Sequence, residues 1–432
     1  MFTVSALCTA LACGDALDVS NGVSLSDTTG SGGNNTTLSN QRSVNIVRGV
    51  KPKKDVDWAV RPCAKDSDYR HLASDQCLPR FTSWGYAPFD WPVAPDKPNV
   101  TCDPGEFEKA VERDLDDGGL AYVLLPVGCD MALPTEVTVT RDNMIIDGGS
   151  TRTTLRTNAV TSMRINGRKN VVLRRLTLDG QVTSEDQDTV RTLVEIDDFS
   201  DNVLVEHIVA KNVYMQHFRG NNASRVTYRY NWLDQSQKFH GIQNDEGYEN
   251  VAIYSNYVTR TGQVPKADGY GINSHGSMAE ICGNYLEENK VGVKVQDANG
   301  LLFHHNHIVG STGSSLRGVR TAWDRSKRSA KQPKDQLFYA NYIDTGSRDH
   351  WAFNFSDLKG GFLVANRFGT VADSVSAKNE SGADTMIFSC LENSENDVGG
   401  IAQYGEFAPI AAGQEVFPAY PGLPAFDPCM LP

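Results

Sequence analysis

The sequence has no apolar run of about 18 residues, so it predicts no transmembrane helix. Its nine cysteines include no CxxC pair, which argues against a zinc ribbon or a thioredoxin-type redox motif. Positive charge is in deficit, because the net charge is −12 and the pI is near 5.3. A basic field that would bind nucleic acid or a membrane surface is therefore disfavoured. Leucines at the fixed offsets of a leucine-rich repeat are also missing.

The chain does contain a short pattern that recurs between residues 224 and 368. Each copy ends in an asparagine, a large side chain and an apolar residue, as in RYNWL and YSNYV. Successive asparagines are 25, 28, 22, 35 and 25 residues apart. Such a period indicates a stacked repeat, because one unit of this size cannot bury its own apolar face. The asparagines are Asn231, Asn256, Asn284, Asn306, Asn341 and Asn366.

Within each repeat the residues alternate in polarity, as in short strands, and Gly and Asn separate the strands. Stacked asparagines can hydrogen-bond to one another, which satisfies amides that would be costly to bury. The pattern predicts an all-β protein, a parallel β-helix over residues 106–370 with one coil per repeat and irregular terminal segments. A helix in GEFEKAVERDLDDGG would cap the first coil. Its apolar face would consist of Phe107, Ala110, Val111 and Leu115.

The N-terminal segment predicts export. SALCTALACGD resembles the end of a bacterial lipoprotein signal, in which Cys13 would carry the lipid, and an ordinary secretion signal is the alternative. Residues 1–45 would form this leader and a tether rich in Ser, Gly and Asn. Residues 46–105 predict an irregular, disulfide-pinned segment, and residues 371–432 predict a C-terminal cap. We therefore expect a secreted or cell-surface protein.

Export also favours disulfides. Sequence alone leaves the connectivity open, and pairing of nearest neighbours is the simplest assignment. It leaves Cys282 as a free thiol inside the coil stack. The predicted pairs are Cys63–Cys77, Cys102–Cys129 and Cys390–Cys429.

The first predicted strands suggest a family. AYVLLPVGCDMALPTEVTV followed by NMIIDGG resembles the first coils of the pectin-lyase-like right-handed parallel β-helix superfamily, and the resemblance extends over about residues 106–370. It implies action on carbohydrate without deciding the chemistry, because the superfamily hosts lyases, glycoside hydrolases, epimerases, esterases and phage tailspikes. The N-T-D, D-D, G-H-G and R-I-K signatures of polygalacturonases are absent, which disfavours hydrolysis of pectin.

A second row of strands lies between the asparagine segments, in HGIQND, YGINSH, VGVKVQ, RGVRTA and WAFNFS. Their flanking Ile and Val residues would face inward, so the polar residues between them would form one outward column. Long polar groups on one face of a solenoid suit an extended polymer. The expected column is Gln243, Asn273, Lys294, Arg320 and Asn354.

Lys294 is the first candidate catalytic residue. A nearby arginine, Arg317 or Arg320, would lie about one coil away, roughly 5 Å by strand spacing. Neighbouring cations lower the pKa of a lysine, and a neutral lysine can act as a general base. Such a pair could take the C5 proton of a uronate and protonate the leaving glycosidic oxygen. The alternative is that these charges only keep the solenoid face soluble.

The segment VGVKVQDANGLLFHHNHIVGSTGSSLRG resembles the catalytic coils of polysaccharide lyase family 6, the alginate lyases and chondroitinase B. The resemblance implies Lys294 as the base and Arg317 as its partner. The Ser after the Lys and the His after the Arg in that family are absent here. The family also implies calcium at the substrate carboxylate, with Glu287 and Asn289 in the matching places. Solvated turn residues are the alternative.

Further candidates surround this segment. The insertion between Asn306 and Asn341 is basic, so Arg325 and its neighbours could attract an anionic polymer. Gln243, Asn273 and Asn354 of the column are further candidates for binding the polymer. The alternation rule predicts that the rings of His304, His305 and His307 stack with neighbouring aromatic rings and do not form a metal site. A second catalytic cluster is an alternative candidate, because histidine titrates near neutral pH and glycosidases use carboxylates as acid and as base or nucleophile. It consists of His240, Lys266, Asp268, Tyr270 and His275.

Together these features predict an exported β-helix that cleaves an acidic polysaccharide, of alginate or glycosaminoglycan type, by β-elimination. One alternative is a glycoside hydrolase or uronan epimerase on the same groove. Another is a non-catalytic carbohydrate-binding or adhesion solenoid. We expect no nucleic-acid partner and no cofactor other than calcium.

Overall fold

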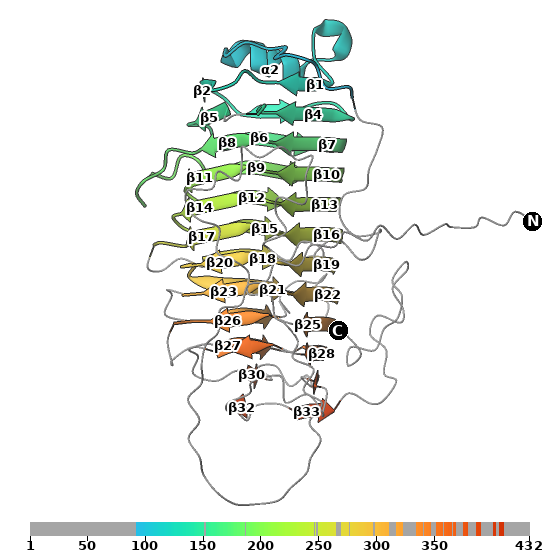
Figure 1. Ribbon diagram of the computed structural model, residues 1–432, viewed down its shortest axis with the longest axis vertical. Coiled ribbons are helices and arrows are strands. Elements are labelled where there is room, and N and C mark those ends of the chain that lie inside the picture. The colour runs from blue at the N-terminus through green and yellow to red at the C-terminus, as the bar shows by residue number, and fades with distance from the viewer. Residues whose placement is uncertain are drawn as a thin grey trace, which may run out of the picture. The chain divides into compact units, whose positions relative to one another are not determined.

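The computed structural model describes residues 92–150, 153–185, 187–245, 247, 249–264, 269–275, 277–296, 299–310, 317–322, 334–339, 341–346, 351–356, 358–364 and 366–368, and four short strands beyond them. Figure 1 shows these strands stacked into a solenoid along the long axis. No helix among them has the length and apolar character needed to cross a membrane.

The described strands form three sheets in which every pair of neighbours is parallel and comes from successive coils. Sheet A consists of β1 (Tyr122–Leu124), β4 (Met144–Asp147), β7 (Lys169–Arg174), β10 (Asp201–Glu206), β13 (Ser224–Arg229), β16 (Glu249–Tyr254), β19 (Ser277–Cys282), β22 (Asn299–His304), β25 (Lys334–Tyr339), β28 (Lys359–Val364), β31 (Met386–Ser389) and β33 (Glu406–Pro409). Sheet B consists of β2 (Asp130–Leu133), β5 (Thr153–Thr157), β8 (Leu176–Asp179), β11 (Val209–Val213), β14 (Trp232–Ser236), β17 (Tyr257–Thr261), β20 (Tyr285–Glu287), β23 (His307–Val309), β26 (Tyr342–Asp344) and β29 (Arg367–Phe368). Sheet C consists of β3 (Val137–Val139), β6 (Thr161–Asn166), β9 (Thr192–Asp197), β12 (Gln216–Gly220), β15 (Ile242–Asn244), β18 (Tyr270–Ser274), β21 (Val291–Gln296), β24 (Arg317–Ala322), β27 (Trp351–Ser356), β30 (Val375–Lys378) and β32 (Ile401–Ala402). The predicted parallel β-helix is confirmed.

Side chains that alternate along each strand fill the interior of the solenoid. Ile242, Ile272 and Val293 of sheet C are fully buried and belong to one apolar core, as the sequence predicts. Rings also stack from sheet to sheet inside the coils, since Phe218 lies 5.6 Å from Tyr228 between centroids. Each coil therefore shares its core with the coil above and the coil below.

The six predicted asparagines form a continuous hydrogen-bonded ladder at the turn between sheets A and B. Each amide nitrogen donates to the oxygen of the next asparagine, as in Asn256 to Asn284 at 2.9 Å, and to a carbonyl of the preceding coil. Each oxygen also accepts the backbone N–H of the preceding asparagine. The buried amides are thus satisfied, and the prediction of a ladder is confirmed.

The residue before the ladder position has a left-handed backbone. Tyr230, Ser255 and His305 have φ values of 55°, 56° and 52°, and Gly283 takes the same role at 62°. Only glycine adopts this conformation without a steric cost, so the asparagine bonds hold the other turns in place. His207 has φ 54° in an earlier coil without a ladder asparagine, so the turn shape extends beyond the ladder.

Helix α2 (Pro104–Glu112) lies over the first coil and caps it (Figure 1). Asp103 begins it by accepting the N–H of Glu106 at 2.9 Å, and a proline occupies the first helical position. Phe107, Ala110 and Val111 are buried, as predicted. Leu115 was expected on the same face, and this is wrong. It lies past the helix end in a 3₁₀ turn, Leu115–Asp117, and is 60% exposed.

The structure tests two of the predictions about cysteines. Cys102 and Cys129 form the expected disulfide, which ties the segment before α2 to the first coil. The prediction that Cys282 is a free thiol is wrong, because its sulfur is disulfide-bonded. The other predicted pairs, Cys63–Cys77 and Cys390–Cys429, lie outside the described residues, as do residue Cys13 and the whole of segment 1–45.

The coil pattern continues beyond residue 370, where the sequence suggested that a cap begins. Strands β30 and β32 extend sheet C, and β31 and β33 extend sheet A. Part of the predicted cap therefore contributes strands to two of the three sheets. The described part of segment 46–105 runs from residue 92 to α2 and its cap.

Candidate functional site

The predicted polar column has the expected register on sheet C, but two of its members are buried, since Asn273 is 4% and Asn354 2% exposed. Gln243 pairs with Asn273, and Asn273 pairs with Lys294. Lys294 pairs with Arg320, which in turn pairs with Asn354. One residue from each coil thus occupies the same position, because side chains of parallel strands in register point the same way. We call these five residues the polar column.

The register separates the two candidate arginines. Arg320 is the direct neighbour of Lys294 on the next strand. Arg317 begins β24 and pairs with Trp351, three residues before the column position. No pair in the register joins Arg317 to Lys294, because the partner of Lys294 on β24 is Arg320. The backbone register therefore pairs Lys294 with Arg320 and not with Arg317.

Lys294 lies against two residues of the second predicted cluster, Tyr270 and His240, so these three share one site. Its Nζ is 5.4 Å from the ring centroid of Tyr270, a cation–π distance. The Tyr270 ring in turn lies 5.0 Å from the ring of His240. Both His240 and Tyr270 are almost completely buried, and Lys294 is half-buried at the surface of the site.

His240 is held in one orientation and one protonation state. The backbone N–H of Tyr270 donates to His240 Nδ1 at 3.2 Å, so the neutral ring carries its proton on Nε2. The side-chain amide nitrogen of Asn273 lies 3.3 Å from Nε2. Burial, and then the charges of Lys294 and His275, hold the pKa of His240 well below its usual value.

This environment changes the role expected of His240. It was a candidate because free histidine titrates near neutral pH, but burial removes that property. As a neutral ring it contacts the backbone of β18 and the amide of Asn273. It also packs against the Tyr270 ring that lies under Lys294. His275, at the end of β18, is bound through its backbone N–H to the carbonyl of Asn244 at 2.8 Å.

Several predicted residues lie outside the described part of the chain. Lys266 and Asp268 belong to residues 265–268, and Arg325 belongs to residues 323–333. Three predicted binding residues are described, and one of them, Asn273, contacts His240. Gln243 donates to Asp245 at 2.5 Å and accepts from Gln216, and Asn354 is 2% exposed.

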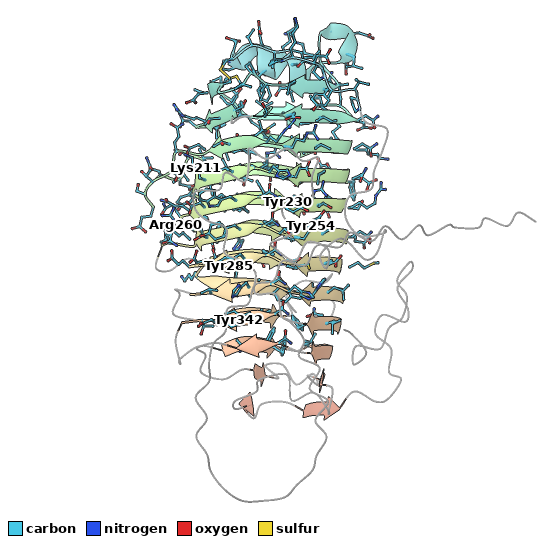
Figure 2. The ribbon with its side chains drawn as sticks, in the orientation of Figure 1. Lys211, Tyr230, Tyr254, Arg260, Tyr285 and Tyr342 are labelled. Atoms are coloured by element: carbon cyan, nitrogen blue, oxygen red, sulfur yellow. A yellow bond between two sulfur atoms is a disulfide. The ribbon has the colours of Figure 1, made fainter. Side chains whose placement is uncertain are left out.

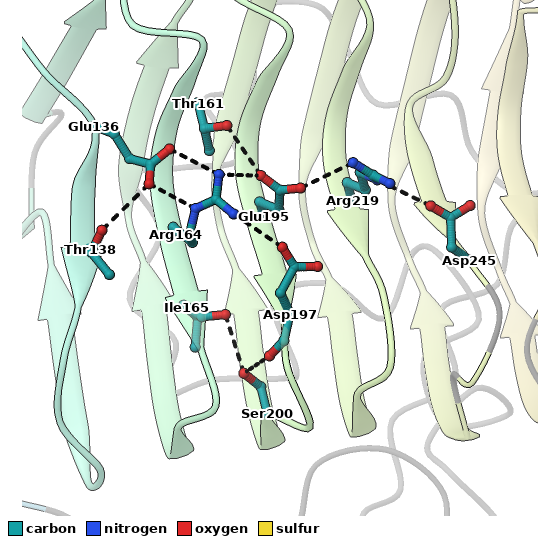
Figure 3. A network of polar contacts seen from close by, with 10 residues as sticks. All are labelled: Glu136, Thr138, Thr161, Arg164, Ile165, Glu195, Asp197, Ser200, Arg219 and Asp245. Carbon is teal, nitrogen blue, oxygen red and sulfur yellow. Dashed lines mark hydrogen bonds and ion pairs between the residues drawn. The ribbon is translucent and has the colours of Figure 1, made fainter.

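The N-terminal half of the same outer face carries a charged network that the sequence analysis missed. Figure 3 shows Arg164 between three carboxylates, with 2.7 Å to Glu136, 3.0 Å to Glu195 and 3.3 Å to Asp197. Arg219 continues the network from Glu195 to Asp245, at 3.1 Å to each. Arg164, Glu195 and Arg219 stand in the same register as Gln243, so the column extends across the whole sheet.

The network is acidic on balance, because four carboxylates face two guanidiniums. Burial, and then repulsion by Glu195, raises the pKa of Asp197 to about 6. The signal in the sequence is the alternation of Glu195 and Asp197 in VEID, which puts two acids on one face of one strand. The outer face of sheet C thus changes from acidic at β9 to basic at β21 and β24.

Asp197→Asn tests this network through the pH dependence of stability. A carboxyl whose folded pKa lies above its unfolded value of about 3.9 stabilises the fold fully below that value, and this stabilisation is lost as pH rises through about 6. We expect wild-type protein to lose about 1–2 kcal/mol from this group between pH 4 and pH 7.5, and the variant to keep it. Urea unfolding at both pH values measures the difference.

The matched control is Asp188→Asn, which removes an exposed carboxylate bound to Arg191 outside the network. It changes the net charge equally and should leave the pH dependence unchanged. An equal effect of both variants would show that total charge, and not the buried position of Asp197, sets the result.

The two expected calcium ligands do not form a calcium site. Asn289 is buried, and its oxygen already accepts the backbone N–H and the hydroxyl of Thr261 at 3.2 and 2.9 Å. Glu287 stands on sheet B, not sheet C, and its carboxylate accepts the hydroxyl of Tyr257 at 2.6 Å. Because the Asn289 oxygen is used inside the fold, the donor set does not fit, and we derive no step through calcium.

A second group of ligand-type side chains lies on sheet A. Ligand atoms of Cys282, His304 and His305 lie within 4.8 Å of one another. The sulfur of Cys282 is in a disulfide and offers no thiolate, so this group is not a built metal site. His307 packs edge-to-face between Tyr285 and Tyr342, with centroids 5.0 and 4.6 Å away, so it takes its predicted place in the aromatic column, although its ring does not lie parallel to its neighbours.

Comparisons with known proteins give distant matches. No protein-family model and no curated protein matches the chain. Among solved structures, a mutant of the periplasmic alginate epimerase AlgG is 11% identical, with a TM-score of 0.41, over 76% of this chain and 93% of that chain. PfbA, a surface adhesin of Streptococcus pneumoniae, is 12% identical, with a TM-score of 0.44, over 67% and 88%. A tailspike variant of E. coli bacteriophage HK620 is 11% identical, with a TM-score of 0.48, over 71% and 64%. The strand register, rather than these matches, identifies the chain as a parallel β-helix.

Proposed function

We propose that the polar column is the active face of a polysaccharide lyase that cleaves a uronate polymer by β-elimination. The observation that supports this most is the pairing of Lys294 with Arg320 on adjacent parallel strands. Neighbouring strands are about 4.8 Å apart, so both positions lie within reach of one sugar unit.

The proposed roles follow from the chemistry of elimination. Arg320 binds the uronate carboxylate, which carries negative charge as the C5 proton leaves. The neutral amine of Lys294 takes that proton, a state that the neighbouring cation favours. The electron pair forms the C4=C5 bond as the C4–O bond breaks. The departing oxygen takes a proton back from the Lys294 ammonium, so the balance is complete.

The two alternative enzymes, an epimerase and a glycoside hydrolase, would use the same face of sheet C but differ from a lyase in the chemical step. A uronan epimerase would begin with the same proton abstraction and return the proton to the opposite side of C5. A glycoside hydrolase needs two carboxylates across the bond, and Asp245 is already held by Arg219 and Gln243. A secreted or surface location, with or without a lipid at Cys13, fits each alternative and stays a prediction.

Ultraviolet absorbance during incubation with alginate, chondroitin and dermatan sulfates, and pectate tests the proposal. Each elimination leaves a conjugated C4=C5 bond that absorbs, whereas hydrolysis and epimerisation leave none. We expect absorbance to rise with one of these polymers, and parallel assays with calcium and with a chelator test the metal requirement.

A flat trace on every polymer, with folded protein confirmed, would overturn the lyase assignment for these substrates. New reducing ends without absorbance would then identify a hydrolase, and altered uronate stereochemistry an epimerase. Binding without either change would identify a carbohydrate-binding solenoid.

A further inference from the structure

The outer face of sheet B carries a row of rings, one from each of five successive coils. Neighbouring centroids are 6.0, 5.7, 5.0 and 4.6 Å apart along the row. Tyr285 and Tyr342 are labelled on this face in Figure 2. The row is Trp232, Tyr257, Tyr285, His307 and Tyr342, and we call it the aromatic row.

A cavity of about 210 Å³ lies at the N-terminal end of the aromatic row. Trp232 and Tyr257 supply its rings, and Thr259 adds a hydroxyl. Arg260 and Asp234 line it as an ion pair, with 2.7 Å between Nε and Oδ1. The remaining lining residue is Glu288, from the turn after β20. The cavity thus has apolar walls and a polar rim, the composition of a small-ligand site.

Two hydrogen-bonding groups in this cavity differ in what they already bind. The Tyr257 hydroxyl donates to Glu287 at 2.6 Å, and burial, followed by this bond, raises the pKa of Tyr257, which keeps the phenol protonated. The indole N–H of Trp232, the other group, is buried and has no hydrogen-bond partner among the residues that the structure describes. A buried donor without a partner is costly, so a ligand oxygen that reached this N–H after a small movement of the indole would gain a hydrogen bond without breaking another.

We propose that this cavity binds a neutral pyranose unit of a polysaccharide, on a face separate from the polar column. A sugar ring presents C–H groups that pack on aromatic rings and hydroxyls that bond to indole, carboxylate and guanidinium groups. Two carboxylates and one guanidinium line the cavity, so its charge opposes a uronate. The polar column presents Lys294 and Arg320 and favours the opposite charge.

The experiment is a titration of the full chain with neutral hexasaccharides of glucose, mannose and galactose, by calorimetry and tryptophan fluorescence. We expect one of them to bind with Kd near or below about 1 mM. Trp232→Ala should weaken binding about tenfold or more, because it removes both the ring and the free donor. Trp232→Phe keeps a ring for packing and should lose about threefold if the indole N–H binds the sugar.

The matched control is Tyr342→Ala, which removes a ring from the same row three coils away from the cavity and should leave Kd within twofold. Three results would overturn the proposal: no binding by any of the neutral sugars, equal binding by Trp232→Ala, or equal binding by uronate hexasaccharides that also depends on Trp232. Elimination at the polar column is measured separately by absorbance, so failure there and failure here are distinguishable.

Discussion

Replacement of Lys294 by alanine is expected to lower kcat/KM for elimination by about 10³-fold, within the range for loss of a general base. Lys294 stands on β21 beside Arg320, and its Nζ lies over the ring of Tyr270. Alanine removes the proposed proton acceptor and leaves the neutral His240 in place. Initial rates of absorbance increase on the preferred polymer measure the loss.

Lys294→Arg separates charge from proton transfer. The guanidinium keeps a positive charge for polymer binding but is not deprotonated near neutral pH, so the variant should bind normally and remain inactive. Lys211→Ala is the matched control, because Lys211 is an exposed lysine on sheet B that pairs with Asp179. A rate for Lys294→Ala within about twofold of wild type would remove this residue from the mechanism.

Replacement of Asn284 by alanine is expected to lower the free energy of unfolding by about 3–5 kcal/mol. Its oxygen accepts the backbone N–H and the amide of Asn256 at 3.0 and 2.9 Å. Its amide donates to Ile253 and Asn306, at 2.9 Å each. Because the site is 1% exposed, water cannot replace these bonds, and several buried groups lose their partners.

Urea unfolding followed by far-ultraviolet circular dichroism measures the effect on the ladder. Asn158→Ala is the matched control, since Asn158 is exposed and its single long contact to Gln181 is 3.4 Å. This control should change stability by less than about 0.5 kcal/mol. Equal midpoints for Asn284→Ala and wild type would show that the ladder is not what holds adjacent coils in register.

The coil stack could be predicted because one repeated contact is written directly in the sequence. Each ladder asparagine bonds to the next, so the spacing from Asn231 to Asn366 marks successive coils. The polar column followed from the same logic, because Ile and Val at alternate positions fix which way Lys294 faces. Both predictions depend only on neighbours along one strand and on the period.

The missed features depend on contacts that this period does not encode. Arg164 meets Asp197 from another coil, and a residue pattern shows the two charges without showing their distance. Asn289 is a residue type that can bind a metal ion, but its side-chain oxygen accepts a hydrogen bond from Thr261 inside the coil stack. Leu115 fits the helical spacing of apolar residues, but α2 ends at Glu112, three residues before it. In each case a three-dimensional contact overrides a local pattern.

The shared register has an evolutionary consequence. Every coil adds one side chain to the same position on sheet C, from Arg164 to Asn354, without changing the direction of the others. Duplication or deletion of a whole coil would therefore lengthen or shorten the face by one unit while the core and ladder stay continuous. The length of this face can then vary by gain or loss of whole coils, and the side chain at each position by a single codon.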